Sequence, residues 1–187
     1  MGELRIETMP NYSEMPDAEL VEQIRKTNDP YWFGILYDRY SKPVYNKCLM
    51  FIKKPEDAKD LTHDIFLRVF ISLSQFKGNA LFSTWLYSIT YNFCMSFLRK
   101  KNIVVELFDN HDTSDEVEID DQEFLQIRAR QLEWALFEIS PEERMILLMK
   151  YQDDMSIKDI QETLSLGESA VKMRLKRAKS RIVTLCK

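Results

Sequence analysis

Residues 155–182 restrict the possible folds of this chain more than any other stretch. Ser156 and Asp159 stand three residues apart before an apolar period, which is the spacing of a capping box at a helix start. Apolar side chains then recur every three or four residues, as on one buried helix face, at Ile157, Ile160 and Leu164. The tripeptide Ser-Leu-Gly at 165–167 interrupts this period and predicts a tight turn.

A second helix is predicted directly after the turn, and it is strongly basic. Its inner face would carry Val171, Leu175, Ala178 and Ile182. Six of the ten residues from 172 to 181 are basic and none is acidic: Lys172, Arg174, Lys176, Arg177, Lys179 and Arg181. Two short helices, a short turn with Gly and a basic second helix indicate a helix-turn-helix that binds DNA. An ordinary helical hairpin with a solvated lysine face is the alternative, and the one-sided charge argues against it.

Composition extends this helical prediction to the whole chain. Only 4 of the 187 residues are Gly and 6 are Pro, and the many Leu, Ile, Met, Lys and Glu residues favour helices. The net charge of -4 is unevenly distributed, at +2 over residues 1–102, -9 over 103–123 and +3 over 124–187. A mildly acidic chain with one concentrated basic helix indicates a local and conditional DNA contact.

The acidic segment 103–123 divides the chain. It contains nine acids, no Lys or Arg, and little periodicity, which predicts a flexible linker between domains. Fully extended, about 21 residues reach ~70 Å at most, or about two turns of DNA. We therefore predict an all-α chain of two small helical domains. Residues 1–28 form a leader and a short helix, 29–102 the first domain, and 124–187 the helix-turn-helix domain.

A helix predicted over residues 55–74 combines an apolar stripe with a row of acids. Its inner face would carry Ala58, Leu61, Ile65 and Val69. Asp57, Asp60 and Asp64 recur at spacings of three and four and therefore share the opposite face. Periodicity alone leaves two interpretations open, a solvated face or a docking surface.

An aromatic helix follows a predicted turn at Gly78-Asn79. Leu86, Ile89, Phe93 and Phe97 would face inward, whereas Trp85, Tyr87, Tyr91 and Met95 fall on other faces. The helix ends in Arg99-Lys100-Lys101. Exposed rings beside basic residues suit unpaired bases, which stack on rings while Lys and Arg follow the phosphates. The alternative is that these rings complete a small core.

Several function classes find no support in the sequence. Three cysteines lie far apart and only two histidines are present, so no metal site or cofactor is predicted. The sequence has neither a Gly-rich phosphate loop nor a nucleophile elbow. No apolar run reaches membrane-spanning length, and residues 1–15 do not resemble a secretory signal. We therefore expect a cytoplasmic protein without membrane insertion.

The order of these segments resembles a bacterial RNA polymerase sigma factor of the extracytoplasmic-function (ECF) class in the sigma-70 family. The resemblance runs from about Asp29 to the C-terminus. It is carried by the stretches DAKDLTHDIFLRVF, FKGNALFSTWLYSITYN, FLRK and ISPEERMILLMKY, followed by the helix-turn-helix. Two positions depart from the pattern in the turn: Ser165 stands where Gly is usual, and Gly167 where a Ser-type cap is usual.

The resemblance implies a role for each segment. The helix at 55–74 would dock on the clamp helices of core RNA polymerase through Asp57, Asp60, His63, Asp64 and Leu67. His63 stands where Gln is usual in the family. The loop from 76 to 81 and the following helix would open the minus-ten promoter element through Phe76, Lys77, Asn79, Phe82, Trp85 and Asn92. The basic helix would read the minus-thirty-five element through Ser169, Lys172, Arg174, Lys176 and Arg177. The acidic segment would thread through the polymerase cleft.

Partners and alternative functions follow from the same comparison. The partners implied are core RNA polymerase, promoter DNA and an inhibitory anti-sigma factor, and no enzymatic activity is expected. One alternative is a stand-alone helix-turn-helix regulator whose first domain senses a ligand or partner. Another is a helical nucleic-acid hydrolase, against which the lack of a metal-ligand cluster and of paired acids argues.

Overall fold

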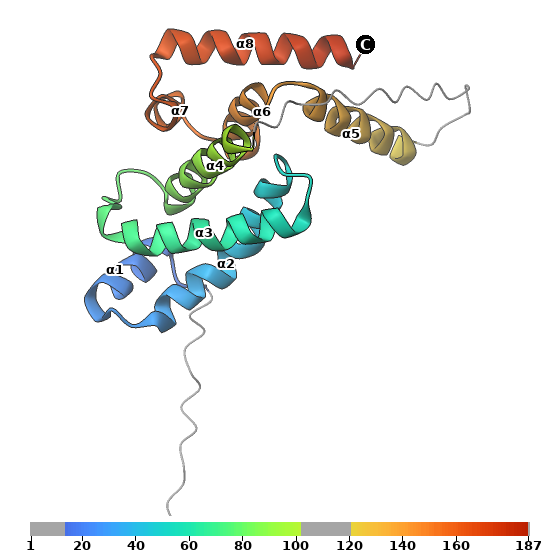
Figure 1. Cartoon of the computed structure of the whole chain (residues 1–187). Coiled ribbons are helices and arrows are strands. Elements are labelled where there is room, and N and C mark those ends of the chain that lie inside the picture. The colour runs from blue at the N-terminus through green and yellow to red at the C-terminus, as the bar shows by residue number, and fades with distance from the viewer. Residues whose placement is uncertain (1–13, 102–120, 187) are drawn as a thin grey trace, which may run out of the picture.

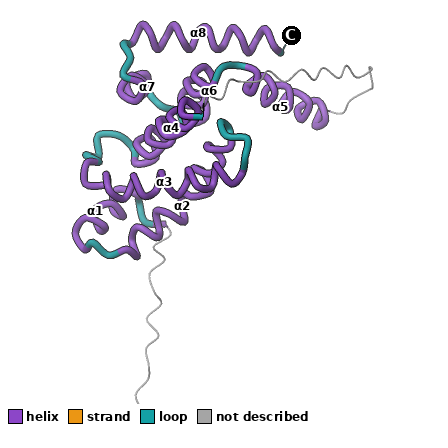
Figure 2. Tube along the Cα trace, viewed as in Figure 1, coloured by secondary structure: helices purple, strands orange, loops and turns teal. Residues whose placement is uncertain are grey.

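The computed structural model describes residues 14–101 and 121–186, and within these ranges it contains helices and loops but no strand (Figure 2). The first half comprises α1 (Asp17–Thr27), α2 (Pro30–Leu49), α3 (Pro55–Ser72), the short 3-10 helix η2 (Leu73–Gln75) and α4 (Phe82–Lys100). The second half comprises α5 (Asp121–Glu138), α6 (Pro141–Leu147), η3 (Leu148–Gln152), α7 (Ile157–Leu164) and α8 (Glu168–Leu185). η3 is a single π-helical turn. The predicted all-α fold with a helix-turn-helix in the second half is confirmed.

The helix starts follow local sequence signals. Asp29 accepts a hydrogen bond from the Tyr31 N–H at 2.9 Å at the start of α2, and Pro55 occupies the first turn of α3. Ser140 and Ser156 each form a capping box with the acid three residues later, at α6 and α7. The caps of α2, α6 and α7 satisfy backbone N–H groups that have no partner within the helix, whereas α3 begins with a proline, which has no N–H to satisfy. These four boundaries could therefore be predicted.

Each half contributes its own part of the core. In the first half, α2, α3 and α4 bury the predicted stripe of α3 together with Leu36, Val44 and Leu86. In the second half, α8 buries Val171, Leu175 and Ala178. α4 also contacts α6 and α7, so it lies between the helices of the two halves (Figure 1). Among the described residues, no helix has the length and apolar character needed to cross a membrane.

Several sequence predictions need correction. Tyr91 and Met95 were expected away from the inner face of α4, but both are buried. Tyr91 is covered because Asp153 of the second half lies against its hydroxyl. Leu132 follows the apolar helical period of residues 124–139, which predicts an inward position, yet it is 47% exposed. α5 begins at Asp121 rather than 124. A proline inside a helical pattern predicts a break or a kink, yet Pro43 lies within the single helix α2. Residues 103–120 of the predicted linker, and most of the predicted leader, lie outside the described residues.

The turn between α7 and α8 carries residues that do not match its backbone conformations. Ser165 ends α7 in the left-handed region, with φ at 53°, whereas Gly167 precedes α8 with φ at -74°. A left-handed conformation favours Gly, and a helix N-cap favours Ser. Position 165 therefore favours Gly and position 167 favours Ser, which is the reverse of the residues present.

We expect Ser165→Gly to raise the free energy of unfolding by about 0.5–1 kcal/mol, because it relieves the left-handed strain. Gly167→Ser should add a few tenths of a kcal/mol by capping α8, since a Cβ at Gly167 meets nothing within 4 Å. Urea denaturation followed by tryptophan fluorescence measures both changes. Ser180→Gly, in the middle of α8, is the matched control and should destabilise the protein.

Candidate nucleic-acid interface

The basic residues of α8 form an exposed surface. The five residues predicted to face DNA are all exposed: Ser169, Lys172, Arg174, Lys176 and Arg177. The inner residues of α8 are buried against α6 and α7, so the helix presents its basic side outward. Lys172 Nζ lies 2.5 Å from Glu168 Oε1 one turn earlier. Lys172 is therefore partly neutralised within its own helix, whereas Arg174 forms no ion pair with any residue that the structure describes.

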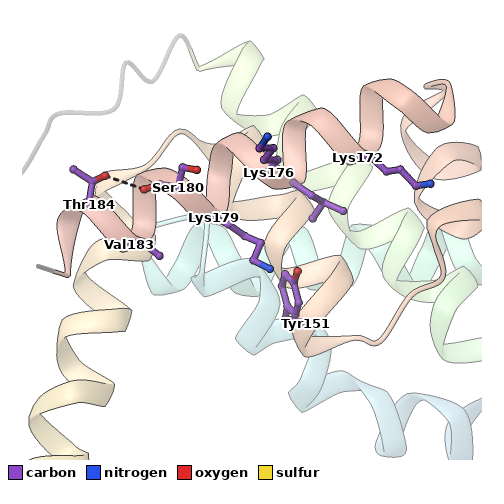
Figure 3. A pocket seen from close by; sticks show the side chains of 8 residues that line it. Tyr151, Lys172, Lys176, Lys179, Ser180, Val183 and Thr184 are labelled. Atoms are coloured by element: carbon purple, nitrogen blue, oxygen red, sulfur yellow. Dashed lines mark hydrogen bonds between the residues drawn. The ribbon is translucent and has the colours of Figure 1, made fainter.

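A groove of about 630 Å³ runs beside α8 and involves a residue that the sequence did not indicate (Figure 3). It lies between Tyr151 and one side of α8, and Lys179 Nζ stands 5.3 Å from the centre of the Tyr151 ring. Tyr151 is exposed. Its position in the π turn, between two well-marked helices, gave no pattern that would identify it. The groove is lined by Tyr151, Lys172, Leu175, Lys176, Lys179, Ser180, Val183 and Thr184.

The loop before α4 differs from the surface expected from sequence. Phe76 is only 7% exposed and Phe82 is buried beside it, with ring centres 5.7 Å apart. The half-buried Trp85 completes the cluster, 5.3 Å from Phe76. The Phe76 carbonyl also accepts a hydrogen bond from Arg25 of α1. The Phe76 and Phe82 rings therefore support the loop from inside, because the short loop packs them against Trp85. They do not form the exposed stacking surface that the sequence predicted.

Polar residues of the same loop and of α4 are at the surface. Lys77, Asn79 and Asn92 are exposed, and Gly78 provides the turn with φ at 73°. Leu81 is 74% exposed and was not singled out from sequence, although an apolar residue just before a helix start is a usable signal. The surface available to a DNA strand thus consists of polar side chains and Leu81, which lie over the packed aromatic cluster.

The outer face of α3 carries acids beside apolar residues. Asp60, His63, Asp64 and Leu67 are all exposed, and the periodicity had predicted this for the two aspartates. Asp57 is different, because Lys101 Nζ donates to its Oδ2 at 2.7 Å and stands 4.5 Å from the Phe97 ring centre. Phe70 and Ile71 are also exposed, at 48% and 69%. They add apolar surface to this face. The sequence pattern already indicates this for Phe70, which is apolar and lies outside the inner stripe, and Ile71 could have been recognised in the same way.

Comparison with known proteins gives this geometry a family context. Residues 36–103 match the model of sigma-70 region 2, and residues 130–182 match that of sigma-70 region 4. The chain is 24% identical to the ECF RNA polymerase sigma factor SigW of Bacillus subtilis, over 89% of this chain and 94% of SigW.

Two solved structures share the fold. One is CnrH in complex with the cytosolic domain of CnrY, at 20% identity and a TM-score of 0.63, covering 90% of this chain and 96% of CnrH. The other is the sigma factor RpoE of Bartonella quintana in complex with the anti-sigma factor NepR. It shows 18% identity and a TM-score of 0.59, over 82% of this chain and 95% of that one. With the two region matches in order along one chain, the protein belongs to the ECF class of the sigma-70 family of RNA polymerase sigma factors.

Proposed function

We propose that this protein directs core RNA polymerase to a specific set of promoters, assists their melting, and is not an enzyme. The observation that carries the proposal is that separate surfaces for separate partners lie on one chain. An acidic and apolar face lies on α3, a polar loop lies before α4, and a basic helix lies in the second half. A duplex-binding regulator would need only the last of these.

Each surface suits a different partner. Asp60 and Asp64 on α3 complement a basic polymerase surface, and Leu67, Phe70 and Ile71 supply apolar contact area beside them. Lys77 and Asn79 present a cation and an amide to an unpaired strand. Arg174 and Lys176 suit the major groove and its phosphates. The aromatic cluster of Phe76, Phe82 and Trp85 holds the loop in place.

We expect Asp60→Arg with Asp64→Arg to weaken binding to core polymerase strongly without unfolding the protein. Both side chains are exposed, so reversing their charge costs little stability, whereas it juxtaposes like charges in the proposed interface. Titration of labelled protein with core polymerase measures the affinity. The matched control is Glu19→Arg with Asp38→Arg, which makes the same charge change on exposed residues of α1 and α2. Equal affinities for the two double variants would exclude α3 as the docking face.

Substitutions on α8 test the recognition of the minus-thirty-five element. Arg174→Ala should relax discrimination at one base pair of the minus-thirty-five element by ~1–3 kcal/mol, as expected for a base-reading arginine. Lys172→Ala should weaken binding to all sequences alike and lower the salt slope by about 1. Transcription with core polymerase on a library of upstream variants distinguishes the two effects. Parental rates on every variant would contradict the role of α8, and tight duplex binding without polymerase would favour a stand-alone regulator.

An inhibitory partner is part of the proposal. The RpoE structure with similar fold contains an anti-sigma factor, and this chain exposes an apolar and acidic face on α3 that such a partner could cover. Competition between the partner and core polymerase for α3 would then control the activity of the protein.

A further inference from the structure

The helix α1 holds the start of the loop at 76–81, which the proposed function assigns to the opened strand. Arg25, in the last turn of α1, donates from Nη2 to two backbone carbonyls, that of Leu73 at 2.9 Å and that of Phe76. Leu73 begins η2, and Phe76 is the first residue of the loop. Figure 1 shows α1 beside the end of α3 from which this loop leaves. One side chain of α1 therefore fixes the first end of the loop.

The contact of Arg25 satisfies carbonyls at the end of a helix. The last carbonyls of a helix have no partner within it, and a cation near them also interacts favourably with the helix dipole. The Leu73 carbonyl accepts from the Phe76 N–H at 3.2 Å, which closes a short turn. The Arg25 guanidinium bridges this carbonyl to that of Phe76. A guanidinium suits such a bridge, because its rigid planar head carries several donors.

The other end of α1 reaches the far end of the loop through Tyr40. Asp17, the first residue of α1, accepts hydrogen bonds from the Tyr40 hydroxyl and from Arg39, both in α2. The Tyr40 ring centre stands 5.5 Å from that of Phe82, where α4 begins directly after the loop. Burial, with Asp17 accepting from the hydroxyl, raises the pKa of Tyr40, so the hydroxyl remains a donor. Both ends of the loop are thus held from α1.

A loop with fixed ends suits the capture of a DNA strand. Lys77 and Asn79 are exposed on this loop. A loop that is ordered beforehand loses little conformational freedom on binding, so more of the contact energy remains for the strand. Extruding a base is itself unfavourable. An additional cost of ordering the loop would therefore slow promoter opening directly.

Arg25 contributes little to the core of the domain. It is exposed, whereas Leu20, Val21 and Ile24 are buried and attach α1 to α2. Removing the guanidinium therefore opens no cavity, and substitutions at exposed positions usually have small effects on stability. The match to sigma-70 region 2 begins at residue 36, so it does not include α1. The main effect of Arg25 is thus expected on the loop.

We propose that Arg25 is a positioning residue for promoter opening, which keeps the loop at 76–81 in its strand-binding conformation by holding the carbonyls of Leu73 and Phe76. The inference rests on the proposed function, because that function assigns the loop to the opened strand. Asp17 and Tyr40 support the other end of the same loop. Arg25 acts through the backbone of the loop, and its role requires no contact with DNA.

Backbone NMR relaxation in the free protein tests the positioning without polymerase. We expect order parameters of about 0.85 for residues 77–81 in the parent protein and below ~0.6 in Arg25→Met, which keeps an apolar stem but has no donor. Lys26→Met is the matched control, since Lys26 is the exposed neighbour of Arg25 in α1 and pairs with Glu22 one turn earlier. It makes the same charge change and should leave the loop rigid.

Promoter opening with core polymerase tests the consequence. On closed duplex, Arg25→Met should form open complexes at least tenfold more slowly than the parent, with unchanged affinity for core polymerase. A template with a pre-formed bubble at the minus-ten element should recover most of the rate, because the strand is then already open. Arg25→Lys should be intermediate, since an ammonium lacks the planar fork. Ile24→Val destabilises α1 from its buried side but keeps the Arg25 hydrogen bonds, so it controls for a general loss of stability.

The outcomes separate this inference from the proposed function. If the parent protein formed no open complexes with core polymerase on a promoter selected from a genomic library, the sigma-factor function itself would be contradicted. If the parent opened the promoter and Arg25→Met opened it equally fast, the positioning role would be wrong. A rigid loop in Arg25→Met, or the same loss of rate in Ile24→Val and Arg25→Met, would also overturn the inference, because Arg25 would then only support the fold.

Discussion

Asp153→Asn is expected to shift the docking equilibrium of the two halves towards the separated form by ~3–5 kcal/mol, or a factor of ~10²–10⁴. The substitution keeps the size of the side chain but removes the negative charge. Asp153 forms a salt bridge with Lys47 of α2, whose side chain is only 7% exposed, so Lys47 would then be a buried ammonium without a counter-ion. The molecule can avoid this penalty without unfolding, because separating the halves returns Lys47 to water. Small-angle scattering should show a larger radius of gyration for the variant.

The matched control for this prediction removes both charges. Lys47→Met with Asp153→Leu leaves no uncompensated charge, and replacing a buried pair by apolar residues of similar volume is often neutral or stabilising. We expect this double variant to retain the compact radius of the parent. A compact single variant, or an expanded double variant, would show that the ion pair does not hold the halves together. Tyr91→Phe, which removes one hydrogen bond, should have a smaller effect of about 1 kcal/mol.

The sequence predicted features whose causes lie within a few residues. Ser156 and Asp159 determine a helix start together, and Gly78 determines a turn, so no distant contact was needed. The exposed acids of α3 followed from periodicity for the same reason. Local periodicity could not predict the ion pair of Asp57, because its partner Lys101 is 44 residues away.

The junction between the halves could not be predicted from local patterns. Lys47 and Asp153 are 106 residues apart, and nothing near either one marks it as buried. The π turn that positions Asp153 arises within an apolar run that resembles an ordinary helix. Tyr91 illustrates the consequence: its position on α4 indicated an outer face, but the second half buries it. A chain treated as two independent domains offers no signal for a contact that only their docking creates.

Phe76→Ala is expected to destabilise the first half by ~3–5 kcal/mol, because it removes a buried aromatic side chain and leaves a cavity. Phe76 packs against Phe82 and Trp85, and its carbonyl and that of Leu73 accept hydrogen bonds from Arg25. Losing the ring should therefore loosen the loop, η2 and the end of α1 together. Asn79→Ala, at the exposed position directly after Gly78 in the same loop, should change the free energy of unfolding by less than ~0.5 kcal/mol.

The two variants should also differ in promoter opening, measured by permanganate footprinting with core polymerase. Extruding a base costs a few kcal/mol, and a surface contact returns only part of this, so Asn79→Ala should slow opening on closed duplex. A template with a pre-formed bubble at the minus-ten element should largely restore it. Phe76→Ala should be impaired on both templates at temperatures near its lowered midpoint of unfolding, since its defect is structural. If the bubble rescued Phe76→Ala as fully as Asn79→Ala, the Phe76 ring would have to leave its buried position and contact the strand directly.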